Sequence, residues 1–269
     1  MFEQELAFAN ELADEAGRIG MSFFRGTFDV REKVDKTPVT EADLAIEEMV
    51  RQALKARFPQ DAVLGEEAGL EGASNRRWIV DPIDGTKNFA DGVQVWGNLI
   101  ALAVDDVPVV GVVNAPALGE RYEAARGSGA RMNGERIHVS RADRVERAFV
   151  LHADVPDWID GPYVEAIIEL LKGARRDRGF GDFWGHMLVA RGSADVMLEP
   201  ELATWDWAAL WVIVEEAGGR VTTFEGERLS HGSSVLTTNG ILHDELVARL
   251  SHAAREAERE TEREAEREA

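Results

Sequence analysis

WIVDPIDGTKNF, residues 78–89, is the most informative stretch of this chain. It opens with a short apolar run that is typical of a buried β-strand, and Pro82 marks the end of that strand. Asp81 and Asp84 stand three residues apart around this proline. Carboxylates at the exit of a strand are held on a rigid element and still face solvent, so the pattern indicates that both converge on one cation.

The residues that follow are suited to a phosphate group. Gly85 lets backbone N–H groups approach an anion closely, and the hydroxyl of Thr86 can hold a water molecule or a substrate oxygen. If a helix begins after Thr86, its N-terminus adds a favourable potential for an anion. Hard oxygen ligands of this kind select Mg²⁺ or Mn²⁺ over zinc.

Two further acidic segments lie far away along the chain. LGEEAG at 64–69 contributes Glu66, and ATWDWAA at 203–209 contributes Asp206. With these, the chain has enough carboxylates for two or more ions, which would clamp a phosphate from both sides.

Each acidic residue also has an ordinary explanation. Asp-Pro sequences are common in turns, and the pair Glu66–Glu67 suits a helix N-terminus. Asp206 suits the cap of a helix that begins near it, and Asp43 suits a capping signal with Thr40. The joint occurrence of these segments, in this order and separation, favours a metal site.

Composition narrows the function further. The 269 residues carry a formal charge of −20, which disfavours binding to nucleic acid or to an anionic membrane surface. The chain has no cysteine, which excludes disulfides, thiolate zinc sites and cysteine nucleophiles. An acidic N-terminus and the lack of any apolar stretch of about 20 residues predict a cytoplasmic protein.

Periodicity predicts alternating helices and strands. Helices are expected from residue 2 to near Gly26 and again after Thr40, and strands at WIVDP, LIALAV, VPVVGVV and ERYEAA. In the second half AFVLHA, ADVMLE, VTTF and SVLTTN read as strands. YVEAIIELLKGA, HMLVARGSA, WDWAALWVIVEEAGG and HDELVARLSHA read as helices. Layers of helix and sheet are the expected architecture.

The C-terminal segment 253–269 has a different character. Residues 255–268 contain seven Glu and four Arg and no apolar face. Glu and Arg at spacings of three and four stabilise a solvated helix but not a buried one. We therefore expect a charged helical or disordered tail, with a role in partner binding left open.

Together the GEE, W-x-x-DP-x-DGT-x-NF and WD-x-AA segments resemble the inositol monophosphatase superfamily, over roughly residues 5–250. The resemblance implies an α/β layered sandwich (αβαβα) of the inositol monophosphatase and fructose-bisphosphatase kind. It implies one catalytic unit, 1–252, made of a metal-site half at about 1–145 and a substrate half at 146–252. It also implies a homodimer and a small-molecule phosphate ester as substrate.

The same resemblance implies roles for individual residues. Two or three Mg²⁺ ions, or Mn²⁺, would be held by a set of five residues: Glu66, Asp81, Asp84, Asp206 and, through its carbonyl, Ile83. Glu66 and Thr86 would position the attacking water, with Asp43 supporting it. Gly85 and Thr86 would also contact the substrate, and Lys33, within KVDKTPVTEAD, would lie near the phosphate.

The segment RGFGDFWGHMLVARGSADVMLEPELATWDWAAL, residues 178–210, resembles the histidinol-phosphate phosphatases of this superfamily, which act in histidine biosynthesis. Histidinol phosphate carries an ammonium and an imidazole, so an acidic wall suits it better than it suits a neutral polyol. Asp182 and Glu199 would provide that wall. Alternatively, Asp182 bonds its own loop, His186 is a packed helix residue and Trp184 is structural instead of stacking on imidazole.

Two competing functions stay open at this stage. One is a phosphatase of the same fold that acts on inositol 1-phosphate or a related small phosphate. The other is a regulatory binding protein that keeps the metal site as a relic, against which the intact acidic motifs argue.

Overall fold

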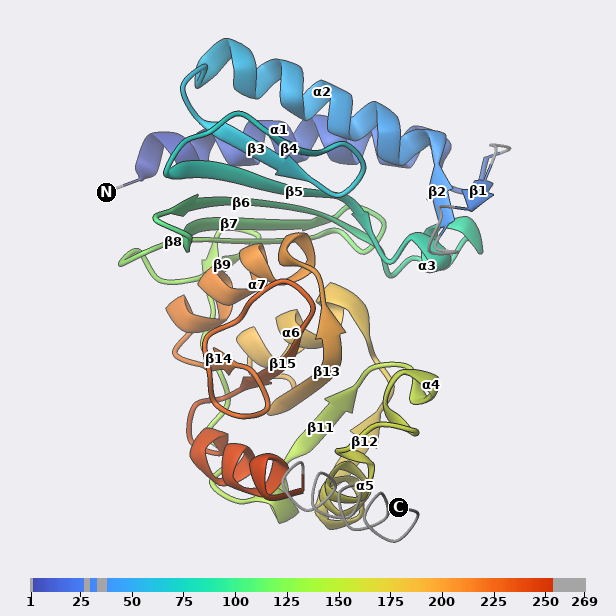
Figure 1. The fold of residues 1–269 in the computed structure, drawn as a ribbon, viewed down its shortest axis with the longest axis vertical. Helices are drawn as coiled ribbons and strands as arrows, with labels where there is room; N and C mark the ends of the chain where they lie inside the picture. Colours follow the sequence, from blue (N-terminus) through green and yellow to red (C-terminus); the bar gives the residue numbers. More distant parts are fainter. Residues whose placement is uncertain (1, 27–29, 33–37, 254–269) are drawn as a thin grey trace, which may run out of the picture.

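The computed structural model describes residues 2–26, 30–32 and 38–253, and these form five layers (Figure 1). Two long helices cover the outer face of a large sheet, two further helices lie between this sheet and a smaller one, and helices cover the far face of the smaller sheet. The layers, in order, contain α1 (Glu3–Phe23) and α2 (Glu41–Arg57), the large sheet, α6 (Asp182–Ala190) and α7 (Thr204–Glu216), the small sheet, and α5 (Val164–Gly173) with the helical residues 243–253. The predicted αβαβα sandwich is confirmed.

The large sheet has eight strands in the order β10-β9-β8-β7-β6-β5-β3-β4. Its neighbours are antiparallel except β3 and β5, which run parallel. The strands are β3 (Ala62–Gly65), β4 (Gly69–Glu71), β5 (Arg76–Asp84), β6 (Gly97–Val104), β7 (Val107–Ala115), β8 (Glu120–Ala125), β9 (Arg131–Met132) and β10 (Glu135–Arg136).

The small sheet has five strands in the order β12-β11-β13-β15-β14, with β11 parallel to both of its neighbours. They are β11 (Phe149–His152), β12 (Arg176–Arg178), β13 (Val196–Leu202), β14 (Arg220–Thr222) and β15 (Ser233–Thr238). The remaining short elements are the ribbon β1 (Val30–Glu32) with β2 (Pro38–Thr40), α3 (Thr86–Ala90), the 3-10 turn η1 (Val145–Arg147) and α4 (Val155–Trp158). The chain passes from the large sheet to the small sheet between residues 136 and 149. The division into two catalytic halves near residue 145 stays a prediction.

The capping signal at the start of α2 is confirmed. The hydroxyl of Thr40 accepts hydrogen bonds from the N–H groups of Ala42 and Asp43, and the Asp43 carboxylate accepts from the Thr40 N–H at 2.8 Å. This reciprocal pattern satisfies otherwise unpaired donors of the first turn and fixes where the helix begins.

Two apolar cores hold the large sheet between its helical layers. One side packs on α1 and α2 and buries Trp78, Trp96 and Phe89 completely. The other side packs on α6 and α7. The helices that carry the C-terminal site residues are therefore docked on the same sheet that carries Asp81 and Asp84, which places distant segments beside one another.

The structure corrects two of the sequence-based predictions, and two others fall outside the described residues. The helix expected at HMLVARGSA begins four residues earlier, at Asp182, and ends at Ala190. Residues 66–68 form a turn between β3 and β4, so the alternative of a helix N-terminus at Glu66 is wrong. Lys33 and the tail from residue 254 lie outside the described residues. Within the described part, no helix combines the length and apolar character needed to span a bilayer.

Candidate active site

A bulge in β5 brings Asp81 and Asp84 to the same side of the strand. Residues three apart in a regular strand point to opposite faces, but the register between β5 and β6 shifts between these two positions. The carbonyl of Pro82 inside the bulge accepts a hydrogen bond of 2.6 Å from the buried Asn98 amide. Asn98 thereby satisfies a backbone group that the irregular strand leaves unpaired.

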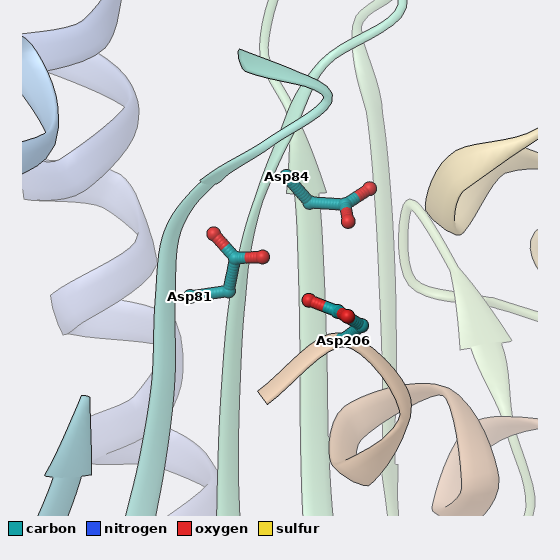
Figure 2. Close-up of side chains that lie close together, drawn as sticks. All are labelled: Asp81, Asp84 and Asp206. Atoms are coloured by element: carbon teal, nitrogen blue, oxygen red, sulfur yellow. The ribbon is translucent and has the colours of Figure 1, made fainter. Parts of the chain in front are cut away.

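Asp206 reaches the same place from α7. It is the third residue of the helix, and its Oδ2 accepts a hydrogen bond of 2.8 Å from the N–H of Ala203. Figure 2 shows the three carboxylates of Asp81, Asp84 and Asp206 facing one small space between β5 and the start of α7. One oxygen from each lies within 4.8 Å of the others. Asp206 is therefore both a capping residue and a member of the cluster.

The electrostatics of this cluster favour a cation. Burial, reinforced by Glu66 and then Asp84, raises the pKa of Asp81 well above its usual range, and burial with Asp182 does the same for Asp84. Burial raises the pKa of Asp206 to about 7. Buried Oδ1 of Asp81 has no hydrogen-bond partner within the described residues. Carboxylates held this close repel one another, and a hard divalent cation with oxygen ligands would remove both the repulsion and the unpaired acceptor.

The three carboxylates line a cavity, and most of the other residues expected near the cations line it as well. Glu66, Ile83, Gly85 and Thr86 all line it. The hydroxyl of Thr86 donates to the carbonyl of Ile83 at 2.9 Å. Gly85 has φ of +78°, and a Cβ there would lie 2.9 Å from the carbonyl oxygen of Val95. Only glycine fits this tight strand-to-helix turn.

Asp43 does not line the cavity. It is fully buried at the start of α2, and burial raises its pKa to about 6. Its Oδ2 caps the helix, whereas buried Oδ1 has no hydrogen-bond partner in the described part of the chain. The capping explanation for Asp43 is thus correct, and its support of an attacking water stays a prediction.

A further group of acidic residues lines the same cavity and forms what we call its acidic wall. The cavity has a volume of about 480 Å³, and five carboxylates line it in addition to those near the β5 bulge: Asp154, Asp157, Asp182, Glu199 and Glu201. Glu199 is 5% exposed in the middle of β13, and burial, followed by repulsion from Asp182, raises its pKa well above the usual range. No hydrogen bond to the Glu199 carboxylate is formed within the described residues. A positively charged group in this cavity would compensate the buried charges.

Asp182 connects the wall to the cluster. It is the first residue of α6 with φ of +56°, and its Oδ2 accepts a hydrogen bond of 2.9 Å from the Asn88 amide. The next N–H, of Phe183, donates to Oδ2 of Asp84 at 2.8 Å. Burial, with Asp154 as the largest charged contributor, raises the pKa of Asp182 to about 6. The alternative that Asp182 bonds its own loop is wrong.

The two other aromatic candidates differ in position. His186 is fully buried on α6, and its Nδ1 lies 2.7 Å from the hydroxyl of Thr237, so the packed-residue explanation is correct. Burial lowers the pKa of His186 to about 3. Trp184 lines the cavity, while its indole N–H donates to Glu120 at 3.2 Å.

Sequence reasoning missed several residues of the cavity. Asp154 and Asp157 belong to the acidic wall, and Lys87 brings a positive charge beside it. Asp154 follows β11 almost directly, as Asp81 and Asp84 stand at the end of β5. The strand-exit criterion that singled out Asp81 could therefore have found Asp154.

Comparison with known proteins places this geometry in context. The family model described as the inositol monophosphatase family matches residues 1–258. The chain is 46% identical to the histidinol-phosphatase of Mycobacterium tuberculosis, covering 93% of this chain and 99% of that protein. It is 42% identical to the histidinol-phosphatase of Streptomyces coelicolor, covering 92% and 97%.

Solved structures agree in fold. The inositol monophosphatase of Thermotoga maritima superposes with a TM-score of 0.85 at 32% identity, covering 94% of this chain and 99% of that one. The inositol monophosphatase of Anabaena superposes with a TM-score of 0.82 at 30% identity, covering 93% and 96%.

Proposed function

The chain belongs to the inositol monophosphatase family and is a phosphatase, and we propose that its substrate is histidinol phosphate, which it hydrolyses to histidinol and phosphate. The observation that carries this choice is the acidic wall of the cavity, supported by identities of 41–46% to three histidinol-phosphatases over nearly the whole chain. A leaving alcohol with an ammonium and an imidazole is complementary to such a wall, whereas a neutral polyol is not.

The acidic cluster holds Mg²⁺ in this proposal. Asp81, Asp84 and Asp206 would form the centre of the site, with Glu66 and the Ile83 carbonyl completing it, and two or three ions is the number we propose. Bound Mg²⁺ would lower the pKa of a water molecule and neutralise charge on the phosphate. The buried, mutually repelling carboxylates and the unpaired oxygen of Asp81 support this assignment.

The chain's own residues orient the reaction. Thr86, held by the Ile83 carbonyl at 2.9 Å, would direct its hydroxyl oxygen toward the attacking water, and Glu66 would accept a proton from that water. Gly85 would let the backbone N–H groups of its turn approach the phosphate oxygens. No side-chain nucleophile and no covalent intermediate is required, because positioning and charge neutralisation are sufficient for phosphoryl transfer.

On the far side of the phosphate, Asp182 and Glu199 would bind the cationic alcohol. The Asn88 amide holds Asp182 in place through a hydrogen bond of 2.9 Å, so its carboxylate is pre-oriented before substrate arrives. The proposal also includes a homodimer and a cytoplasmic location, which light scattering and cell fractionation would test.

Phosphate release measured with Mg²⁺ tests this function. We expect turnover of histidinol phosphate well above that of inositol 1-phosphate, and loss of turnover with both substrates after Asp84→Asn in a protein that still folds. Efficient hydrolysis of inositol 1-phosphate with little hydrolysis of histidinol phosphate would contradict the substrate assignment. Near-normal activity of Asp84→Asn at saturating Mg²⁺ would contradict the metal site.

A further inference from the structure

We propose that Glu47 and Arg51 of α2 are positioning residues that hold the turn 66–68 and thereby present Glu66 to the metal site. This inference rests on the proposed function, because it assigns Glu66 to cation binding. Neither residue lines the cavity, so both would act on the metal only through the turn that they grip.

The contact between Glu47 and the turn is direct. Oε2 of Glu47 accepts a hydrogen bond of 2.8 Å from the N–H of Glu67, and Oε1 accepts one of 3.0 Å from the N–H of Ala68. A carboxylate that accepts two consecutive backbone N–H groups fixes the orientation of both peptide units. Both belong to a turn of only three residues, so the two peptide units that directly follow the Glu66 side chain, 66–67 and 67–68, have little freedom.

Arg51 completes the grip from the next turn of the helix. Its Nε donates to Oε1 of Glu47 at 2.8 Å, and its Nη2 donates to the carbonyl of Gly69 at 2.6 Å. The side chains of Glu47 and Arg51 are 3% and 10% exposed. A buried ion pair with all these hydrogen bonds contributes to geometry even where its net contribution to stability is small.

The packing at Gly65 shows how closely the pair approaches the chain. A Cβ on Gly65 would lie 2.4 Å from Cδ and Oε1 of Glu47. Glycine at this position is therefore what lets the carboxylate sit directly against the end of β3. Any larger residue at 65 must displace either Glu47 or the strand.

The turn is also tied to the strand that carries the cluster. The N–H of Glu66 donates to the carbonyl of Val80 at 3.2 Å, and Gly65 pairs with Val80 in the parallel ladder of β3 and β5. Glu66 thus lies beside Asp81, one residue further along β5. Glu47 grips one end of the turn and β5 grips the other, so the position of Glu66 relative to Asp81 is set by both.

Glu47 lies one helical turn beyond Asp43, so the two buried acids share one face of α2. Asp43 feels the charge of Glu66, which adds to the rise in its pKa. The face of α2 that carries both residues therefore faces the turn. This arrangement explains why Glu47 is buried on α2 although it does not line the cavity.

The test measures binding of Mn²⁺ to the purified full-length protein by electron paramagnetic resonance, in parallel with turnover at varied Mg²⁺. Glu47→Gln keeps the shape and one acceptor but removes the charge and the second acceptor. We expect the dissociation constant for Mn²⁺ and the Mg²⁺ concentration for half-maximal rate to rise at least about tenfold, the usual effect of losing a residue that orients a ligand. The KM for substrate at saturating Mg²⁺ should stay within about twofold.

Glu48→Gln is the matched control. Glu48 is the neighbouring acid on the exposed face of α2, where its carboxylate accepts a hydrogen bond of 2.6 Å from the Gln52 amide. Glu48→Gln should leave the dissociation constant for Mn²⁺ and the Mg²⁺ concentration for half-maximal rate unchanged. Gly65→Ala is the second variant, and because its Cβ displaces the Glu47 carboxylate, it should raise the same two constants.

The outcomes are distinguishable. Absence of Mn²⁺ binding by the wild-type protein would contradict the proposed function itself. Wild-type binding with an unchanged constant in folded Glu47→Gln would overturn this inference, and so would a loss confined to the KM for substrate. If Glu47→Gln does not fold, Gly65→Ala decides the question, and an unchanged metal constant in that variant overturns the inference.

Discussion

Replacing Asp206 by Asn should stabilise the metal-free protein at pH 8 while abolishing its function. The carboxylate of Asp206 is buried beside two other acids, and its pKa is raised to about 7. In the unfolded chain the pKa of an aspartate is about 3.9. Between these two pKa values the folded state binds more protons than the unfolded state. The contribution of Asp206 to the free energy of unfolding is therefore fully present below about pH 4 and is lost as the pH rises through about 7.

The magnitude follows from the same shift. Each pKa unit corresponds to about 1.4 kcal/mol, so an isolated carboxylate shifted by about three units would cost about 4 kcal/mol at pH 8. Because Asp81 and Asp84 share the same space, the three carboxyl groups titrate together, and the full shift of Asp206 overstates the cost of its charge alone. We expect a gain in unfolding free energy of about 2–3 kcal/mol for Asp206→Asn, or roughly 5–10 °C in Tm. The Asn oxygen can still accept the Ala203 N–H that Asp206 accepts at 2.8 Å.

The assay is thermal unfolding in a chelator from pH 5 to pH 8, repeated with saturating Mg²⁺. Without metal, the Tm of Asp206→Asn should be higher than that of the wild type at pH 8 and close to it at pH 5. With Mg²⁺ the difference in Tm between the two proteins should shrink or change sign. Metal at 100 times its dissociation constant adds about 2.7 kcal/mol to the free energy of unfolding of the wild type. Glu215→Gln, an exposed acid on the same helix, is the control and should change stability by less than about 0.5 kcal/mol.

A metal-free Asp206→Asn protein that is less stable than the wild type at pH 8 would refute the prediction. A stability difference independent of pH between 5 and 8 would refute it as well. Either result would mean that the cluster carries no stored electrostatic repulsion and that Asp206 acts mainly as a helix cap.

Three further predictions concern residues outside the cluster. Burial lowers the pKa of His186 to about 3, so the wild type should lose stability as the pH falls below 6.5. In chemical denaturation of His186→Gln, the free energy of unfolding should change less with pH between 6.5 and 5, by about 1 kcal/mol per pH unit. Asn98→Ala leaves the buried Pro82 carbonyl unpaired, so denaturant titration should show a loss of about 1–3 kcal/mol, with a higher Mg²⁺ requirement in activity assays. Ending the chain after His252 should preserve Tm and turnover, and a large loss of either would show that the acidic tail packs against the enzyme.

The parts of the fold that sequence reasoning predicted are those with local physical causes. Thr40 and Asp43 fix the start of α2 by mutual hydrogen bonds, and that signal needs no knowledge of the rest of the chain. The strand that leads to Asp81 likewise follows from an apolar run within a few positions.

Other features depend on tertiary contacts. Asp206 meets Asp81 only because α7 docks on the large sheet, and local patterns in the sequence carry no trace of that contact. The start of α6 was missed because Asp182 read as a loop residue, whereas the distant Asn88 amide holds its side chain at the first helical position in spite of a positive φ. The short strand β4 was missed because it pairs only at the sheet edge.

The most direct test of the account compares kcat/KM for histidinol phosphate and inositol 1-phosphate in the wild type and in Asp182→Asn. The substitution keeps the shape and the acceptor for Asn88 but removes one charge from the acidic wall. The account predicts a loss of about 1–3 kcal/mol, about 5- to 150-fold in kcat/KM, for histidinol phosphate and almost none for the neutral inositol ester. Equal losses for both substrates would contradict it, because Asp182 would then support the site without recognising the cationic alcohol.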